Sequence, residues 1–258
     1  MNKPLILVTN DDGIYSEGIY VLQQALAEMG RTVVVAPEAE KSAVGHAITI
    51  SDPIRIKEVS RRNRFNGYAV AGTPADCVKL AVKALLEESP DIVVSGINLG
   101  ANIGTSVLYS GTVSAATEGV ILGIPAIAIS IASLVNPDYS YAAKIAKKFT
   151  GLVLDNGLPE GTALNINVPN VPEKEVRGIK ITRQGASNYN EKFDRRVDPR
   201  QRIYFWMDGD LIHPKEDPDL DDIALRDKFV SVTPLHYDLT NKESFTFFKT
   251  WDIFNNDR

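Results

Sequence analysis

The sequence contains a single cysteine, Cys77, which limits the ways in which the fold is stabilised. One cysteine excludes an intrachain disulfide, and no CxxC pair is present to bind zinc. No apolar run approaches the roughly 18 residues that a membrane-spanning helix needs. The apolar stretch at residues 4–8 is much too short for a signal peptide. We therefore expect a cytoplasmic protein without a membrane partner.

The chain also lacks an excess of basic residues. Its formal net charge is -5 and its isoelectric point is near 5.3, which argues against a stable nucleic-acid partner. The short basic cluster of Arg61, Arg62 and Arg64 is interpreted as a solvated turn between two strands. With 258 residues, of which 44% are hydrophobic, the chain is long enough to bury one large core. We therefore expect a single domain.

The first half alternates short apolar runs with longer amphipathic stretches, which is the pattern of βαβ units. Thr73, followed by Pro74, is expected to cap one of the helices. The expected strands are 5–9, 32–36, 92–95 and 126–131, and the other expected helices are 16–29, 112–122 and 139–152. This order predicts an α/β fold with a doubly wound, mostly parallel, Rossmann-like sheet.

The segments 54–59 and 64–69 are strand-like and predict a hairpin with Asn63 in its turn. The second half has a different sequence pattern. Short strands are expected at 164–168, 176–182, 203–206 and 229–233, and long polar segments connect them. We expect a catalytic core over residues 1–160, and a strand-rich extension of the same domain over residues 161–258.

Two segments of this extension are expected to have few contacts within an isolated subunit. The charged insert from Ser187 to Arg202 is either a surface loop or part of an arm, at about 184–206, that clasps a second subunit. The tail, 240–258, is either a helix packed on its own subunit or a contact between subunits. It carries Phe245, Phe247, Phe248, Trp251 and Phe254. We expect a homodimer or homotetramer.

Four loops that follow predicted strands carry polar side chains where an open parallel sheet binds its ligands. The first contains Asn10, Asp11, Asp12 and Gly13. Two adjacent carboxylates repel each other, and a divalent cation is the simplest group that makes the pair favourable. An ordinary Asp-Gly turn is the alternative.

The second loop contains Lys41, Ser42 and His46. A serine and a histidine four residues apart could be a nucleophile and its base. However, no Gly-x-Ser-x-Gly motif surrounds Ser42, and a hydroxyl is also an oxygen ligand for a hard cation. For His46, proton transfer and a merely hydrogen-bonded role both stay open.

The third and fourth loops are suited to an anion. Gly96, Asn98 and Asn102 lie in a glycine-rich segment that is neither a Walker A loop nor a dinucleotide fingerprint. Ser110, Gly111 and Thr112 lead into a helix, whose N-terminus attracts phosphate, although an ordinary helix cap is the alternative. Together the four loops predict a hard-cation site beside a phosphate cradle.

Several segments resemble the SurE family of stationary-phase survival nucleotidases. The similarity covers most of the chain and is carried by NDDG (10–13), KSAVGH (41–46), SGINLGAN (95–102), SGTVSAA (110–116), GTPADCV (72–78), NINVP (165–169), TRQG (182–185) and VSVTPL (230–235). The resemblance implies one divalent cation per subunit, Mg²⁺ or Mn²⁺, bound by Asp11, Asp12, Ser42 and Asn98. It also implies hydrolysis of nucleoside 5'- and 3'-monophosphates.

Our working hypothesis is attack on phosphorus by metal-activated water, with Asp11 and Asp12 as the catalytic residues. An aspartyl-phosphate route is the mechanistic rival, although the Asp-x-Asp spacing of the haloacid dehalogenase-like phosphatases is absent. A nucleotide-binding sensor and a nucleotide-sugar transferase are the alternative functions. The expected phosphate-binding residues are Asn10, Gly96, Asn98, Asn102, Ser110, Gly111 and Thr112.

Overall fold

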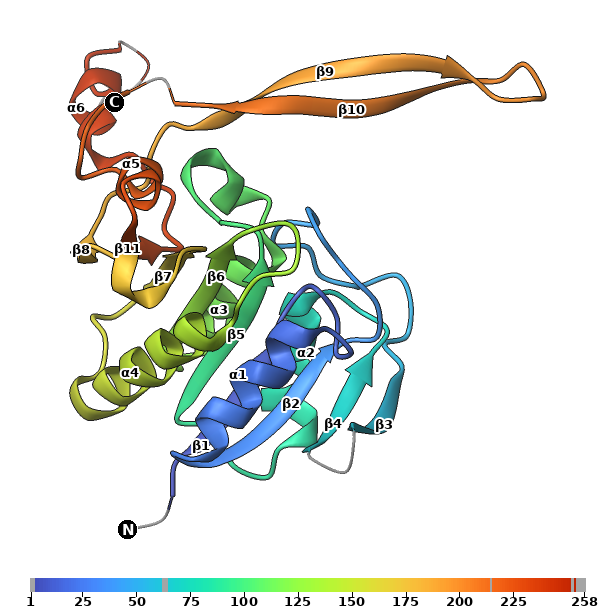
Figure 1. Cartoon of the computed structure of the whole chain (residues 1–258), viewed down its shortest axis with the longest axis vertical. Helices are drawn as coiled ribbons and strands as arrows, with labels where there is room; N and C mark the ends of the chain where they lie inside the picture. Colours follow the sequence, from blue (N-terminus) through green and yellow to red (C-terminus); the bar gives the residue numbers. More distant parts are fainter. Residues whose placement is uncertain (1–2, 62–64, 214, 252, 254–258) are drawn as a thin grey trace.

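A nine-stranded sheet runs through the molecule (Figure 1) in the order β3-β4-β2-β1-β5-β6-β7-β11-β8. The computed structural model describes residues 3–61, 65–213, 215–251 and 253. The parallel strands are β1 (Leu5–Thr9), β2 (Arg31–Pro37), β4 (Phe65–Val70), β5 (Ile92–Leu99), β6 (Ala126–Ala132) and β7 (Thr162–Pro169). Strand β3 (Ile56–Arg61) forms the expected antiparallel hairpin with β4. Residues 62–64, where the hairpin turn and most of the basic cluster were expected, lie outside the described residues.

Helices cover both faces of this sheet (Figure 1). On one face lie α1 (Glu17–Ala27) and α4 (Ser140–Asn156). On the other lie α3 (Gly111–Ile121) and α2 (Pro74–Leu80), which a π-helical turn (Ala81–Leu85) extends. Because successive strand residues point to opposite faces, Ile6 and Val8 pack with the first pair of helices and Leu7 packs with the second. The predicted doubly wound α/β fold is confirmed.

Local sequence signals fix the helix starts. Ser16 caps α1 by accepting a hydrogen bond from the Ile19 N–H. Thr73, directly before Pro74, and Asp76 form a reciprocal capping box at the start of α2. The cap by Thr73 lies where the sequence predicts it, because a cap depends only on residues within one turn of the helix.

The strand order places a switch point beside β1. The chain passes from β1 to β2 and β4 on one side, and then crosses to β5 on the other side of β1. The crossovers on the two sides of β1 therefore diverge between β1 and β5, and the carboxyl ends of these two strands flank the crevice in which such sheets bind ligands.

The carboxyl-terminal half continues the same sheet. Strand β11 (Phe229–His236) pairs antiparallel with β7, and β8 (Gly178–Ile181) pairs with the far edge of β11. The short helix α5 (Asp221–Arg226) precedes β11 and packs on it.

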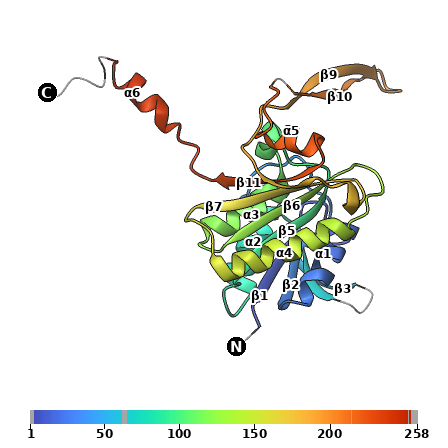
Figure 2. The ribbon, with the colours of Figure 1, turned by 60° about the vertical axis from the view of Figure 1, so that its left-hand side comes forward.

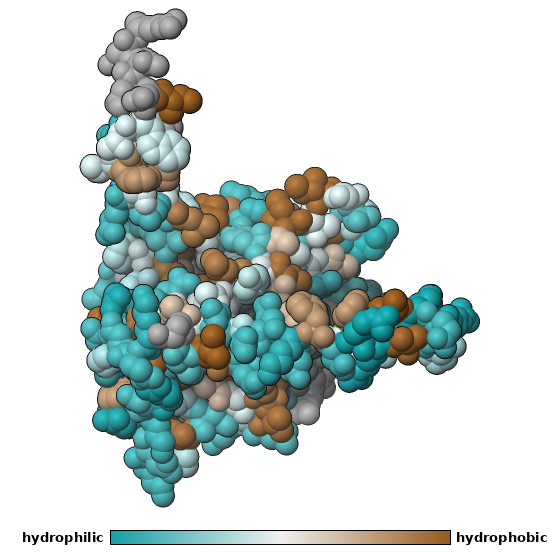
Figure 3. All heavy atoms as spheres, turned by 90° about the horizontal axis from the view of Figure 1, so that it is seen from above, coloured by the Kyte–Doolittle hydropathy of each residue, from teal (hydrophilic) through white to brown (hydrophobic). Residues whose placement is uncertain are grey.

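The charged insert forms a projecting two-stranded arm (Figure 1). Strand β9 (Asn188–Val197) pairs antiparallel with β10 (Ile203–Ile212) along its whole length, and every residue of β9 is exposed. The segment is therefore an arm and not an irregular loop, and it extends beyond the predicted end at residue 206. In Figure 3, hydrophobic residues lie along the arm among hydrophilic ones.

The described part of the tail, residues 240–251 and 253, does not pack on the body of its own subunit. Helix α6 (Phe245–Phe248) follows a 3-10 turn (Lys242–Ser244) and projects away from the sheet (Figure 2). Phe247, Phe248 and Trp251 contact one another edge to face and remain exposed. Phe254 lies outside the described residues. Within the described part of the chain, no helix combines the length and the apolar character needed to cross a bilayer.

Gly18 allows α1 to contact β5, and its replacement gives a first prediction. A Cβ at Gly18 would overlap the carbonyl oxygen of Ile97, a main-chain atom that cannot rotate away. We expect Gly18→Ala to lower the free energy of unfolding by at least about 2 kcal/mol, as overpacking does. In the control Gly151→Ala, the new methyl meets only the end of the Met29 side chain at 3.3 Å. There the higher helix propensity of alanine should stabilise by up to about 1 kcal/mol.

Urea unfolding of both variants measures the difference. Equal stability of Gly18→Ala and the wild type would contradict the close approach of α1 to β5.

Candidate active site

Two predicted loops meet at the carboxyl ends of β1 and β5. Asp11 and Asp12 directly follow β1, and Asp12 Oδ2 accepts a hydrogen bond of 3.1 Å from the Leu99 N–H at the end of β5. Gly96 and Asn98 lie inside β5, at a register irregularity, and not in the loop where the sequence placed them. Asn98 directly precedes Leu99, so the end of β5 that contacts Asp12 also carries Asn98.

The N-terminus of α3 is built against Asp11. The Thr112 N–H donates to Asp11 Oδ2 at 3.0 Å, and the Thr112 hydroxyl donates to Oδ1. A Cβ at Gly111 would lie 2.7 Å from Asp11 Cβ, so only glycine permits this approach. Both donors of Thr112, which was expected to bind phosphate, therefore serve Asp11, and the positive end of the helix dipole favours its ionised form.

Burial nevertheless works against ionisation of both aspartates. Loss of solvent raises the pKa of Asp11, which the hydrogen bonds from Thr112 only partly offset. Burial, together with repulsion from Asp11, raises the pKa of Asp12 to about 7. Among the residues that the structure describes, no lysine, arginine or histidine forms an ion pair with either carboxylate. No cationic side chain of the described residues therefore neutralises the negative charge of the two aspartates.

The four expected metal ligands all keep oxygen lone pairs for a cation. Ser42 Oγ donates to Glu40 at 2.6 Å, and Asn98 Nδ2 donates to the Gly100 carbonyl at 2.7 Å, so neither interaction occupies the Ser42 hydroxyl oxygen or Asn98 Oδ1 as an acceptor. The Lys41 N–H donates to the Asp11 carbonyl at 2.7 Å, which places the Ser42 segment beside Asp11. Carboxylate, hydroxyl and amide oxygens are the ligands that Mg²⁺ and similar hard cations take. The donor set therefore fits such an ion.

Two of the expected phosphate-binding residues also shape the strand ends. Asn10 is buried, and its Nδ2 donates to the Gly13 carbonyl at 3.1 Å and to Ser16 Oγ at 2.8 Å. Gly96 has a φ of 141°, which side-chain-bearing residues rarely adopt, and its Cα faces the backbone of Ile129. Asn10 therefore fixes the loop after β1, and Gly96 allows β5 to lie close to β6.

Asn102 belongs to a buried amide network. Its Nδ2 donates to Ser130 Oγ at 2.8 Å, and its main chain bonds to Asn165 and Asn167 on β7.

Ser110 is the cap of α3. Its Oγ accepts a hydrogen bond from the Val113 N–H at 3.1 Å, which leaves the hydroxyl proton free to meet a phosphate oxygen.

The sequence interpretation missed residues that support the site. Glu40 accepts from Ser42, and its charge adds to the pKa elevation of Asp12. Asn165 and Asn167 hold the loop after β5, and Glu118 of α3 binds His46. Two signals were visible in the sequence: Glu118 is the single charged residue of α3, and Asn165 and Asn167 lie in the segment NINVP (165–169).

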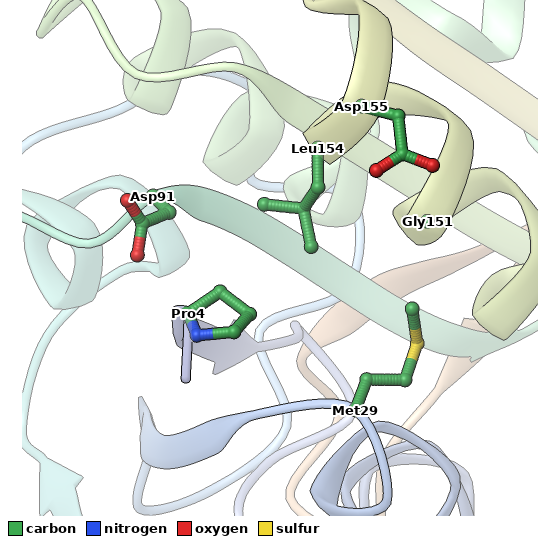
Figure 4. A pocket seen from close by; sticks show the side chains of 6 residues that line it. All are labelled: Pro4, Met29, Asp91, Gly151, Leu154 and Asp155. Atoms are coloured by element: carbon green, nitrogen blue, oxygen red, sulfur yellow. The ribbon is translucent and has the colours of Figure 1, made fainter. Parts of the chain in front are cut away.

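A separate hollow lies at the opposite end of the sheet (Figure 4). Pro4 and Asp91 line it where β1 and β5 begin, and Met29, Gly151, Leu154 and Asp155 complete it. Asp91 is already bound there by the Leu5 N–H at 2.7 Å. The polar residues predicted from the sequence lie at the other ends of these strands, so this hollow is not the candidate active site.

Comparisons with known proteins agree on one family. A family model described as "Survival protein SurE" matches residues 6–191. A Syntrophobacter fumaroxidans protein named 5'-nucleotidase SurE is 49% identical over 248 residues, covering 96% of this chain and 99% of the relative. A Moorella thermoacetica protein of the same name is 52% identical over 238 residues, covering 92% of each chain. The crystal structure of the SurE protein from Aquifex aeolicus matches with a TM-score of 0.83 at 42% identity, over 96% of this chain and 99% of that one.

The raised pKa of Asp12 predicts how the metal-free protein responds to pH. The folded-state pKa of about 7 exceeds the value of about 3.9 of an unfolded chain. The contribution of this group to stability is therefore present below pH 4 and is lost as pH rises toward 7. In EDTA, we expect Asp12→Asn to melt about 2–4 °C above the wild type at pH 8. Near pH 4 the two melting temperatures should agree.

Scanning calorimetry at the two pH values checks this difference. A variant that is less stable than the wild type at pH 8 would show that Asp12 is not under electrostatic strain.

Proposed function

This chain belongs to the SurE family, and we propose that it is a metal-dependent phosphomonoesterase that hydrolyses nucleoside 5'-monophosphates, and also 3'-monophosphates. Family membership makes it an enzyme of the 5'-nucleotidase class, for which its curated relatives are named. We treat residues 1–258 as one domain, with the site in its first 160 residues and the arm and tail in its extension.

One observation carries the proposal. Asp11 and Asp12 are adjacent, desolvated and unpaired with any cationic side chain of the described residues, at the switch point of the sheet. If the pair only shaped a turn, the hydrogen bonds from Thr112 and Leu99 would offset only part of this cost. A divalent cation offsets it, and the N-terminus of α3 directly beside the pair favours a bound phosphate.

Asp11, Asp12, Ser42 and Asn98 would hold the cation, Mg²⁺ or Mn²⁺. When bound, such an ion polarises a phosphate and lowers the pKa of water. Thr112 favours the ionised form of Asp11 and orients its carboxylate through two hydrogen bonds. Asp12 uses only Oδ2 for Leu99, so its Oδ1 is placed to accept the proton of the attacking water.

The remaining predicted residues would bind the phosphate. Ser110 offers its hydroxyl proton and Gly111 offers close main-chain approach at the start of α3. Asn10, Gly96, Asn98, Asn102 and Thr112 stay proposals for this role. The buried position of Asp11, with both oxygens engaged by Thr112, favours the water route over an aspartyl-phosphate, at least for this carboxylate.

A phosphate-release panel separates this function from its rivals. Purified protein is incubated with AMP, GMP, 3'-AMP or an aryl phosphate, with Mg²⁺ or Mn²⁺, and free phosphate is measured. A nucleotide sensor would bind AMP without releasing phosphate, and a nucleotide-sugar transferase would require an acceptor. No phosphate release from any substrate with either metal would refute the proposal.

We expect Asp11→Asn and Asp12→Asn each to lower phosphate release by at least about a hundredfold. Each change removes one negative charge from the cation site and leaves the side-chain shape almost unchanged. Mn²⁺ affinity, measured by calorimetry, should fall in parallel. Asp155→Asn, an exposed change at the far end of the sheet, is the matched control and should retain both properties. Full activity with full Mn²⁺ affinity in either site variant would remove the metal assignment.

We also propose that the protein forms a homodimer or homotetramer through the arm and the tail. Phe205, Trp206 and Trp251 expose between 48% and 59% of their surface, which is unfavourable for large aromatic side chains in a single subunit. Light scattering at micromolar concentration should give a dimeric or tetrameric mass. Trp206→Ser and Trp251→Ser, in separate variants, should then distinguish arm contacts from tail contacts. A single monomeric mass for the wild type would contradict the assembly.

A further inference from the structure

The segment that carries Ser42 has no helix or strand of its own. Residues 38–55, called here the Ser42 loop, connect β2 to β3 and are mostly exposed. Its main chain is held at two points near the site. The Lys41 N–H donates to the Asp11 carbonyl at 2.7 Å, and the Gly45 N–H donates to the Tyr109 carbonyl at 2.9 Å.

Side chains from α2 and α3 fasten the same loop further along. Asp76 accepts two hydrogen bonds from Thr49, from its N–H at 2.9 Å and from its hydroxyl at 2.6 Å. His46 Nε2 lies 2.8 Å from Glu118 Oε2. Among these contacts, the one between His46 and Glu118 is the side-chain anchor nearest to Ser42 in the sequence.

Glu118 is a buried carboxylate with two side-chain partners, His46 and Lys79. It is only 2% exposed, and Lys79 of α2 donates to its second oxygen, Oε1. Burial alone would raise the pKa of Glu118, but the hydrogen bonds from His46 and Lys79 outweigh burial and lower it. The carboxylate is therefore ionised and forms strong, charge-assisted contacts.

The contact of His46 with Glu118 lies away from the N-terminus of α3. Glu118 lies seven residues after Gly111, which is about 10 Å along the axis of α3 from its N-terminus. Of the two roles that the sequence leaves open for His46, this contact favours the hydrogen-bonded one over proton transfer to a phosphate.

We propose that His46 is a positioning residue, which holds the Ser42 loop against α3 through Glu118 and so keeps Ser42 in place for the cation. The expected effect on metal binding rests on the proposed function. The expected effect on the position of the loop does not. Lys79 binds the same carboxylate from α2, so it neutralises Glu118 without holding the loop.

The two partners of Glu118 supply a matched pair of variants. His46→Ala removes the contact between the loop and Glu118 and leaves Lys79 bound to Glu118, while Asp76 still holds Thr49, so the fold should persist. Lys79→Gln removes the lysine charge and leaves the contact of His46 with Glu118 in place. A contact that serves stability alone would make the two variants behave alike.

Amide hydrogen exchange measures the anchor without metal or substrate. We expect His46→Ala to exchange the Lys41 and Gly45 amides at least about tenfold faster than the wild type, because their hydrogen bonds to Asp11 and Tyr109 depend on the position of the loop. Lys79→Gln should leave both amides as protected as in the wild type. His46→Gln, which retains an N–H donor for Glu118, should restore protection.

Metal binding measures the consequence for the site. Calorimetry should show about tenfold weaker Mn²⁺ binding in His46→Ala, the usual size of an effect exerted from outside the ligand set. In the double variant Ser42→Ala with His46→Ala, Mn²⁺ affinity should equal that of Ser42→Ala alone, because His46 acts through Ser42.

The outcomes separate the two proposals. Wild-type exchange and wild-type Mn²⁺ affinity in His46→Ala, or equal effects of His46→Ala and Lys79→Gln, would overturn the positioning role. A protein that releases no phosphate, but whose loop amides respond to His46→Ala and not to Lys79→Gln, would refute the proposed function and retain the anchor.

Discussion

The structure depends on the repulsion between two adjacent carboxylates at the end of its central strand. Asp11 and Asp12 leave β1 together, and burial raises the pKa of each. The surrounding chain is arranged to accept this charge. Thr112 donates twice to Asp11, Leu99 donates to Asp12, and Gly111 lets α3 approach without a side chain. Main-chain donors and a helix dipole reduce the cost of ionisation without a cationic side chain, so the remaining charge is left for a ligand.

The doubly wound sheet was predictable because its signals are local. The strand at residues 5–9 and the helix that Thr73 caps follow from apolar periodicity and capping residues that lie within a few positions of one another. Strand β9 was not predictable in the same way. It is exposed on both faces and pairs only with β10, so it shows neither a buried run nor apolar alternation. The irregular end of β5 was assigned to a loop because Gly96 reads as a strand terminator, whereas here it packs against β6.

The site was predictable in its residues but not in their connections. Adjacent aspartates and hydroxyls after strands are visible in the sequence, and their ligand roles stay predictions. The pairing of Thr112 with Asp11 joins residues 101 positions apart, and that of His46 with Glu118 joins residues 72 apart. Such contacts depend on how α2 and α3 pack across the sheet, which periodicity does not encode. The carboxyl-terminal half also supports the site through a contact between residues distant in the sequence. Asp221 of α5 accepts a hydrogen bond from the Gly104 N–H, close to the amide network of Asn102.

Gly18 and Gly111 bring α1 and α3 to the site through contacts in which a glycine supplies no side chain. Gly18 sets α1 on the carbonyl of Ile97, and Gly111 sets α3 on Asp11. Helices that pack through large core side chains shift when those side chains are exchanged, whereas α1 rests here on the main chain of β5 and α3 rests on the side chain of Asp11 itself. A substitution in the apolar core should therefore change the spacing between these two helices and the strand ends very little, because no core side chain sets either contact.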